Sequence, residues 1–110
     1  MKIYEFSGFK VSTNHEFLSE KNQANIDFYL EVNGQKFWGS AFTLENIKYL
    51  MDTGKENGGN FNGNFFWSAN AIIIRKMSVE CLGEVLAFLI EKREHELILH
   101  AVESSPRSLG

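Results

Sequence analysis

Hydrophobic and polar residues alternate on both sides of Asn33-Gly34. Asn-Gly accepts the positive φ angles of a two-residue type I′ turn, so the pattern predicts a β-hairpin over residues 26–42. Such a turn sets Glu31 opposite Lys36 and Tyr29 opposite Trp38. The face predicted to lie in the core carries Ile26, Phe28, Leu30, Val32, Phe37 and Ala41.

The opposite face of the hairpin combines two large aromatic rings with acidic residues. It carries Asp27, Tyr29, Glu31, Lys36, Trp38 and Ser40. This composition favours a surface that binds another protein, because Tyr and Trp are enriched at interface hot spots. A cross-strand aromatic pair also stabilises a sheet by roughly 0.2–1 kcal/mol without any binding role. Both interpretations of Tyr29 and Trp38 stay open at this point.

Two helices are predicted after the hairpin, each beginning at a good N-cap. Thr43 and Ser78 carry hydroxyls that accept hydrogen bonds from the exposed amides of a first helical turn. The first helix is expected to end near Gly54. Its apolar face carries Leu44, Ile47, Leu50 and Met51.

The remaining segments predict strands and loops. Residues 2–11 alternate as one strand with an irregularity at Gly8, and the polar residues 12–23 predict a loop or a short helical turn. Residues 54–64 are rich in Gly and Asn, which argues against a stable helix or strand. A β-branched run within residues 65–76 predicts a central strand covered on both faces. Alternation over residues 96–102 predicts a final strand with Leu97, Leu99 and Ala101 facing inward.

These elements predict an α+β fold in the order β-β-β-α-β-α-β. We expect a single domain over residues 1–103, built on a mixed, mostly antiparallel sheet of about five strands with two helices. Residues 104–110 are small and polar and predict a disordered C-terminal tail.

Composition restricts the classes of function. A chain of 110 residues can bury one core. Its net charge of −3 argues against a nucleic-acid-binding protein, which normally carries a basic surface. The chain has a single cysteine, no signal-peptide pattern and no apolar run of transmembrane length. Together these features predict a cytoplasmic protein.

No catalytic or metal-binding motif is recognisable. A general acid–base pair would need two of His15, His95 and His100 to meet in one cleft, and their spacing does not require it. One cysteine and three scattered histidines do not match the four ligands of a zinc site. We therefore expect no catalytic residue, no cofactor and no metal. Phe61 is unusual in the polar segment 54–64, and it would either fold back onto the body or contact a partner.

Two segments carry a resemblance to a known family. Residues 38–47 (WGSAFTLENI) are followed by Gly58-Gly59 and then by residues 66–74 (FWSANAIII). This pattern resembles small bacterial immunity proteins encoded beside polymorphic toxins, including those of contact-dependent growth inhibition systems. In that family a sheet segment enters a helix, and a Gly-rich link leads to a strand, a helix and a closing strand. The resemblance spans residues 36–103, about two-thirds of the chain.

The resemblance implies stoichiometric inhibition instead of catalysis. The chain would bind the C-terminal domain of a cognate toxin, often a nuclease with a basic active site, in a one-to-one complex in the cytoplasm. No nucleic-acid or membrane partner is expected. Binding residues do not transfer across the family, so our candidates come from the hairpin face and the Gly/Asn segment: Asp27, Tyr29, Glu31, Trp38, Asn60, Phe61 and Asn62.

Two other classes of function stay open. The first is a small ligand-binding or hydrolytic enzyme domain that uses residues 54–64 as a lid over the sheet. The second is an oligomeric module that buries Tyr29 and Trp38 in a homodimer.

Overall fold

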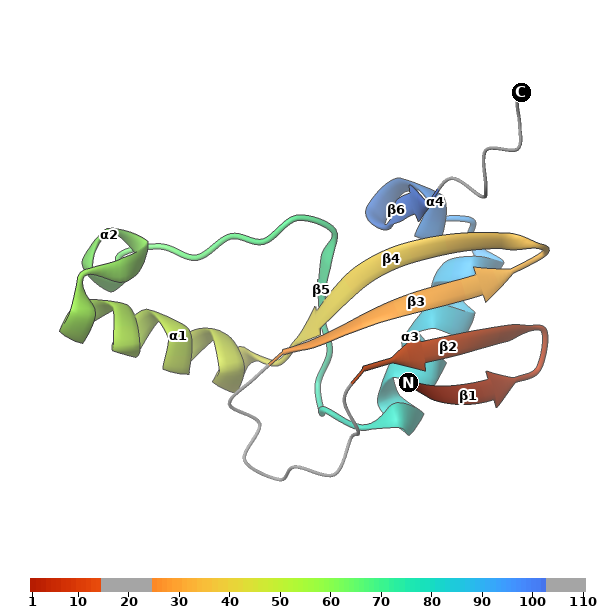
Figure 1. Ribbon diagram of the computed structural model, residues 1–110, viewed down its shortest axis with the longest axis horizontal. Coiled ribbons are helices and arrows are strands. Elements are labelled where there is room, and N and C mark those ends of the chain that lie inside the picture. Colours follow the sequence, from red (N-terminus) through yellow and green to blue (C-terminus); the bar gives the residue numbers. More distant parts are fainter. Residues whose placement is uncertain (15–24, 103–110) are drawn as a thin grey trace.

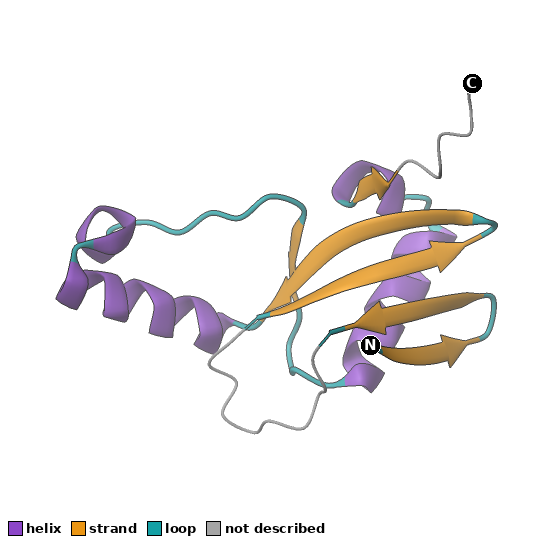
Figure 2. Cartoon of the chain, viewed as in Figure 1, coloured by secondary structure: helices purple, strands orange, loops and turns teal. Residues whose placement is uncertain are grey.

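The computed structural model describes residues 1–14 and 25–102, apart from the side chain of Asn60. In this part of the chain six strands form one sheet, accompanied by four helices (Figures 1 and 2). The strands are β1 (Lys2–Phe6), β2 (Phe9–Thr13), β3 (Ile26–Val32), β4 (Gln35–Phe42), β5 (Ala71–Ile73) and β6 (His100–Val102). The helices are α1 (Leu44–Asn57), α2 (Gly59–Gly63), α3 (Val79–Glu91) and α4 (His95–Ile98). The fold is α+β with a mostly antiparallel sheet, as predicted.

The hairpin of β3 and β4 has the predicted register. Glu31 lies opposite Lys36 and Tyr29 lies opposite Trp38. Asn33 has φ 53° and Gly34 has φ 77°, so both turn residues occupy the left-handed region that a type I′ turn requires. The local chemistry of the turn therefore determines which residues of the two strands face the core.

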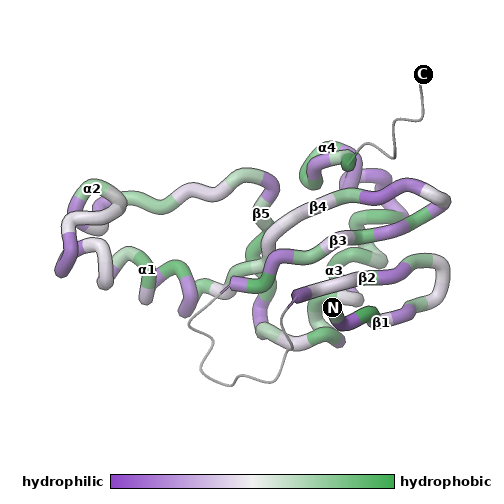
Figure 3. Tube along the Cα trace, in the orientation of Figure 1, coloured by the Kyte–Doolittle hydropathy of each residue, from purple (hydrophilic) through white to green (hydrophobic). Residues whose placement is uncertain are grey.

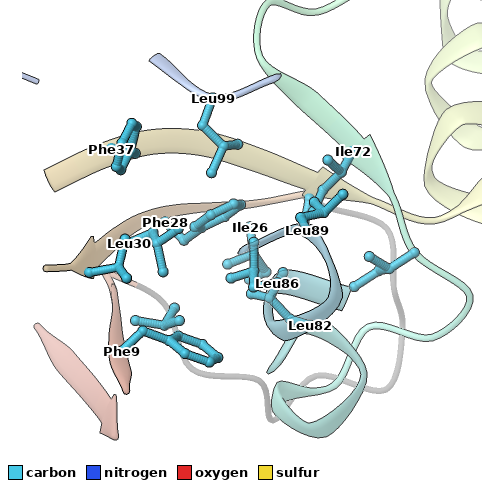
Figure 4. Close-up of a cluster of buried hydrophobic side chains, with 14 of the residues drawn as sticks. Phe9, Ile26, Phe28, Leu30, Phe37, Ile72, Leu82, Leu86, Leu89 and Leu99 are labelled. Carbon is cyan, nitrogen blue, oxygen red and sulfur yellow. The ribbon is translucent and has the colours of Figure 1, made fainter. Parts of the chain in front are cut away.

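Helix α3 covers one face of the sheet and closes the core (Figure 4). Ser78 caps this helix as predicted, its Oγ accepting a hydrogen bond from the N–H of Cys81 at 3.1 Å. Leu82, Leu86 and Leu89 of α3 pack against side chains of the strands. The buried side chains of this core include Phe9, Val11, Ile26, Phe28, Leu30, Val32, Phe37, Ala41, Ile72 and Leu99.

The N-terminal segment is a hairpin and not the single strand predicted over residues 2–11. A tight turn containing Gly8 at φ 92° reverses the chain, and β1 pairs antiparallel with β2. The glycine allows this turn because it adopts a positive φ without a steric cost. Strand β2 also extends to Thr13, into the segment predicted as a loop.

Two short strands share the outer edge of β4. β5 runs parallel to the second half of β4, and β6 runs antiparallel to its first half. Gly39 lies between these two contacts, where a Cβ atom would come within 2.5 Å of Leu99 Cδ2. The missing side chain at residue 39 therefore allows both strands to meet the same edge.

The strand predicted within residues 65–76 is present as β5, but the prediction that it is central and covered on both faces is wrong. β5 has only three residues and lies at the end of the strand order. Ile72 and Ile74 are buried, but Ile73 between them is 56% exposed. The apolar run is therefore covered on one face only, which its composition could not indicate.

The final strand predicted over residues 96–102 is divided between α4 and β6. Arg93 at φ 60° ends α3, and the chain then forms one more helical turn before β6. Leu99 is buried as predicted, but Leu97 is 82% exposed and Ala101 is also exposed. The extra turn removes the two-residue periodicity on which the prediction relied.

Residues 44–70, which we call the arm, project from the sheet (Figure 1). The arm comprises α1, α2 and the extended segment that returns to β5. The molecule measures 47 × 33 × 27 Å, and its radius of gyration of 15.3 Å exceeds the roughly 13 Å of a compact domain of about 100 residues. Figure 3 shows hydrophobic positions along α1, away from the core beneath the sheet.

The prediction that residues 54–64 are neither helix nor strand is also wrong. α1 continues past Gly54 and is capped by Gly58 at φ 85°. A Cβ atom at Gly54 would lie 2.4 Å from the carbonyl oxygen of Gly59. The absence of a side chain therefore lets α2 fold back against α1, and this packing outweighs the low helix propensity of the segment.

None of the helices in the described residues is long and apolar enough to cross a membrane. Most of the loop predicted over residues 12–23, and all of the tail predicted over residues 104–110, lies outside the described residues.

Candidate protein-binding surfaces

The outer face of the sheet, opposite α3, brings together four of the candidate residues. Tyr29 and Trp38 are half-buried neighbours on β3 and β4, and Asp27 and Glu31 flank Tyr29 on the same face. Sheet pairing extends this aromatic row to Ser12 of β2 and His100 of β6, and Ile3 of β1 completes it: Ile3, Ser12, Tyr29, Trp38, His100. The hairpin prediction therefore identified the centre of a surface that spans five strands.

A second row on the same face is balanced in charge. Glu5, Lys10, Glu31 and Lys36 lie opposite one another on four successive strands, so each acidic residue has a lysine beside it. Lys36 Nζ also lies 5.3 Å from the centroid of the Tyr29 ring, a cation–π contact. This row is not the acidic surface that would attract a basic partner.

Asp27 is engaged within the protein. Its Oδ1 accepts hydrogen bonds from Ser40 Oγ at 2.5 Å and from Asn25 Nδ2 at 2.9 Å. Ser40 is only 3% exposed, so this carboxylate satisfies a hydroxyl inside the sheet. A structural role therefore accounts for Asp27 without a partner.

The arm carries the largest group of exposed hydrophobic side chains. Of the ten large hydrophobic side chains exposed in the described residues, five belong to the arm: Leu44, Tyr49, Phe61, Phe65 and Trp67. Trp67, Leu44 and Phe61 are about 70% exposed, at 72%, 71% and 70%. Exposed aromatic side chains on a projecting element are candidates for contact with a partner.

Sequence reasoning found only Phe61 among these arm residues. Leu44 follows the helical pattern of a buried stripe, and Trp67 lies in the segment predicted to be a covered strand. Both predictions assumed that hydrophobic periodicity faces the core. In the arm, hydrophobic side chains face solvent instead, because this segment projects away from the body of the protein. Nothing in the sequence directly indicates that projection.

The backbone at the end of the arm is strained. Phe61, Asn62 and Gly63 have φ angles of 51°, 60° and 80°, so three successive residues are left-handed. Each non-glycine residue in this region costs roughly 1–2 kcal/mol. The Phe61 ring recovers little of this cost through burial because most of it faces solvent. Strain of this kind collects at functional sites.

The candidate residues therefore divide between two surfaces. Asp27, Tyr29, Glu31 and Trp38 lie on the sheet, whereas residues 60–62 lie in α2 at the end of the arm, away from β1 and β2 (Figure 1). This placement puts residues 54–63 at the tip of the arm and not over the sheet.

Several residues in the two segments 38–47 and 66–74 form hydrogen bonds that stabilise the fold. Asn46 is fully buried and forms a reciprocal capping box with Thr43, through bonds of 3.0 and 3.1 Å. Asn70 has φ 54°, accepts a hydrogen bond from the N–H of Ser40 and donates one to the carbonyl of Ile98 at 2.9 Å. Asn70 thereby ties the start of β5 to the segment before β6.

His95 and His100 do not form an acid–base pair. His95 is 6% exposed and packs edge-on against Phe37 of the core at 5.1 Å. Its Nδ1 atom has no hydrogen-bond partner within the described residues. His100 is exposed beside Trp38 on the opposite face of the sheet, and His15 lies outside the described residues. No cluster of three potential metal ligands occurs in residues 1–14 and 25–102.

No protein-family model, curated protein or solved structure matches the chain, so the fold and these two surfaces are the basis for a functional proposal.

Proposed function

We propose that this chain is a bacterial immunity protein that binds and neutralises a cognate toxin domain in the cytoplasm. The observation that carries the proposal is the arm, which places exposed aromatic rings on a projecting element with a strained tip. The resemblance of residues 38–47 and 66–74 to such proteins suggests the class of partner, and the exposure of the arm supports our choice of surface.

An arm of this kind suits an inhibitor. Aromatic side chains bury large areas with few rotatable bonds, so they dominate the binding energy of many protein interfaces. A projecting tip can enter a concave surface, and active sites usually lie in clefts. We therefore assign Phe61, Phe65 and Trp67 as the principal contacts, with the Tyr29–Trp38 row of the sheet as a second surface.

We expect charge to contribute less to the affinity for a toxin than the net charge of the chain suggests. The net charge of −3 favours approach to a basic toxin. The acidic candidates on the sheet are nevertheless balanced by Lys10 and Lys36, and Asp27 is already hydrogen-bonded. We expect affinity to depend on the aromatic rings and to change little with added salt.

Co-expression tests the proposal. The gene directly upstream is first checked for a large protein, and the C-terminal domain of such a protein is then expressed in bacteria with and without this chain. We expect the toxin domain to arrest growth and this chain to restore it. Titration calorimetry should then give a one-to-one complex between the purified proteins.

Matched variants identify the surface. Trp67→Ala and Phe61→Ala should each weaken the complex by about 1–4 kcal/mol, mainly through faster dissociation. Phe88→Ala is the control, because Phe88 is another exposed ring, at 54%, but lies on α3 outside both surfaces. Loss of binding only in Tyr29→Ala and Trp38→Ala would indicate that the toxin-binding site lies on the sheet and not on the arm. Absence of growth rescue and of a complex would refute the immunity function.

A further inference from the structure

One side of α1 is only partly covered within the described residues. With 100° per residue, Leu44, Ile47 and Met51 form an apolar stripe along it. Leu44 is 71% exposed, and Ile47 and Met51 are half-buried. These three side chains line a hollow of about 400 Å³, together with Lys48, Asp52 and Lys55 of the same helix and with Gly63 and Asn64. We call this side the α1 face.

Four charged residues follow the α1 face in a fixed order. Glu45, Lys48, Asp52 and Lys55 alternate as negative, positive, negative and positive, and all four are exposed. They fall within about 80° of one another around the helix, next to the apolar stripe. The order of charges inverts about Leu50. At equal distances along the helix before and after Leu50, the two charged residues have opposite signs.

An order that inverts in this way matches itself when two helices run antiparallel. Glu45 of one helix then lies opposite Lys55 of the other. Lys48 lies opposite Asp52, and these two residues are also joined within each helix by an ion pair of 2.8 Å. A parallel arrangement would instead place each charge opposite an identical one, which is unfavourable. The pattern therefore selects one orientation of a second α1 helix.

We propose that two copies of this chain pair through their α1 faces in a twofold-symmetric, antiparallel dimer. Ile47 and Met51 of each copy enter the hollow of the other, and the four charged residues flank this contact. Symmetry makes every contact occur twice, because a twofold interface joins the same patch on both copies.

The dimer is expected to be weak. α1 has 14 residues and is therefore about 21 Å long, so one helix pair buries less than the roughly 800 Å² per partner of a standard interface. Association should accordingly depend on concentration in the micromolar range. The inference does not rest on toxin binding, for which we assign Phe61, Phe65 and Trp67 outside the α1 face.

Charge reversal tests the pairing. Analytical ultracentrifugation is run on the full chain from about 1 µM to about 500 µM, a range that brackets a weak dimer. The mass should rise from 12.6 kDa toward twice that value. Glu45→Lys and Lys55→Glu should each weaken association at least about fivefold, since two attractive contacts become repulsive. The double variant Glu45→Lys/Lys55→Glu should return to within about twofold of the parent.

Recovery in the double variant separates pairing from an effect on the helix. Glu45 lies in the first turn of α1 and Lys55 in the last, so both favour the helix dipole in the parent. If the substitutions acted only by destabilising α1, the double variant would associate more weakly than either single variant. Glu91→Lys on α3 is the control for a change of net charge and should leave the dimer unchanged.

A mass of 12.6 kDa at every concentration would overturn the proposal, as would a double variant that associates less than either single variant. Met51→Asp provides a second test, because it replaces an apolar side chain of the stripe with a charged one and should abolish the dimer while circular dichroism retains the helical signal. A Met51→Asp variant that is folded and still dimeric would also refute the α1 face as the interface.

Discussion

Asn46→Ala should destabilise the protein far more than its position in a helical first turn suggests. The Asn46 Oδ1 atom accepts a hydrogen bond from the N–H of Thr43 at 3.0 Å, and Asn46 is fully buried. The substitution leaves the Thr43 hydroxyl in place as a cap but removes the acceptor for the Thr43 N–H. Thr43 is itself only 3% exposed, so water cannot easily replace that acceptor.

The magnitude follows from two losses. A buried N–H group left without a partner costs about 1–3 kcal/mol. The cavity left by the amide group adds roughly 1 kcal/mol. A total of about 2–4 kcal/mol is a large part of the 5–15 kcal/mol by which domains are stable. The melting temperature should fall by roughly 10–20 °C.

Urea unfolding followed by fluorescence and circular dichroism measures this loss. Asn64→Ala is the control, since Asn64 is exposed on the arm and its truncation should change stability by less than about 0.5 kcal/mol. If Asn46→Ala also costs less than about 0.5 kcal/mol, the Thr43 N–H has another partner and the capping box does not hold the base of the arm.

Three further predictions address backbone strain, close packing and charge. Phe61→Gly should be more stable than Phe61→Ala by about 0.5–1 kcal/mol, although alanine is usually the more stabilising residue in a helix, because only glycine adopts φ 51° without cost. Equal stabilities of the two variants in urea would contradict backbone strain at the tip of the arm. Gly39→Ala should cost about 1–3 kcal/mol, because the new Cβ would lie 2.5 Å from Leu99 Cδ2 and 3.1 Å from the backbone oxygen of Asn70. A thermal melt like that of the parent would show that these neighbours can move aside freely. A hydrogen bond from Lys48 lowers the pKa of Asp52 below its ordinary value of 3.8. An NMR titration should therefore show a higher pKa for Asp52 in the Lys48→Gln variant. An unchanged pKa would mean that the ion pair is absent in solution.

Local chemistry in the sequence was sufficient for the hairpin and for the start of both long helices. Asn33-Gly34 fixed the turn type, and the turn fixed the register of both strands. Thr43 and Ser78 act as N-caps through hydrogen bonds that span only three residues. Each of these features depends on neighbours in the chain, so each could be predicted without knowledge of the tertiary structure.

Tertiary packing decided the features that the sequence did not indicate. Gly54 resembled a helix end, but contact with Gly59 makes it the interior of a helix against which α2 folds. The run at Ile72–Ile74 resembled a central strand, but its neighbours cover one face only.

The same limit applies to the candidate surfaces. Alternation along the hairpin placed Tyr29 and Trp38 on the outer face, because that arrangement follows from the register. The exposure of Leu44 and Trp67 could not be predicted, because hydrophobic periodicity indicates which residues share a face and not whether anything covers that face. The course of the arm away from the sheet decided that, and it depends on contacts between residues far apart in the sequence, such as Asn70 with Ile98.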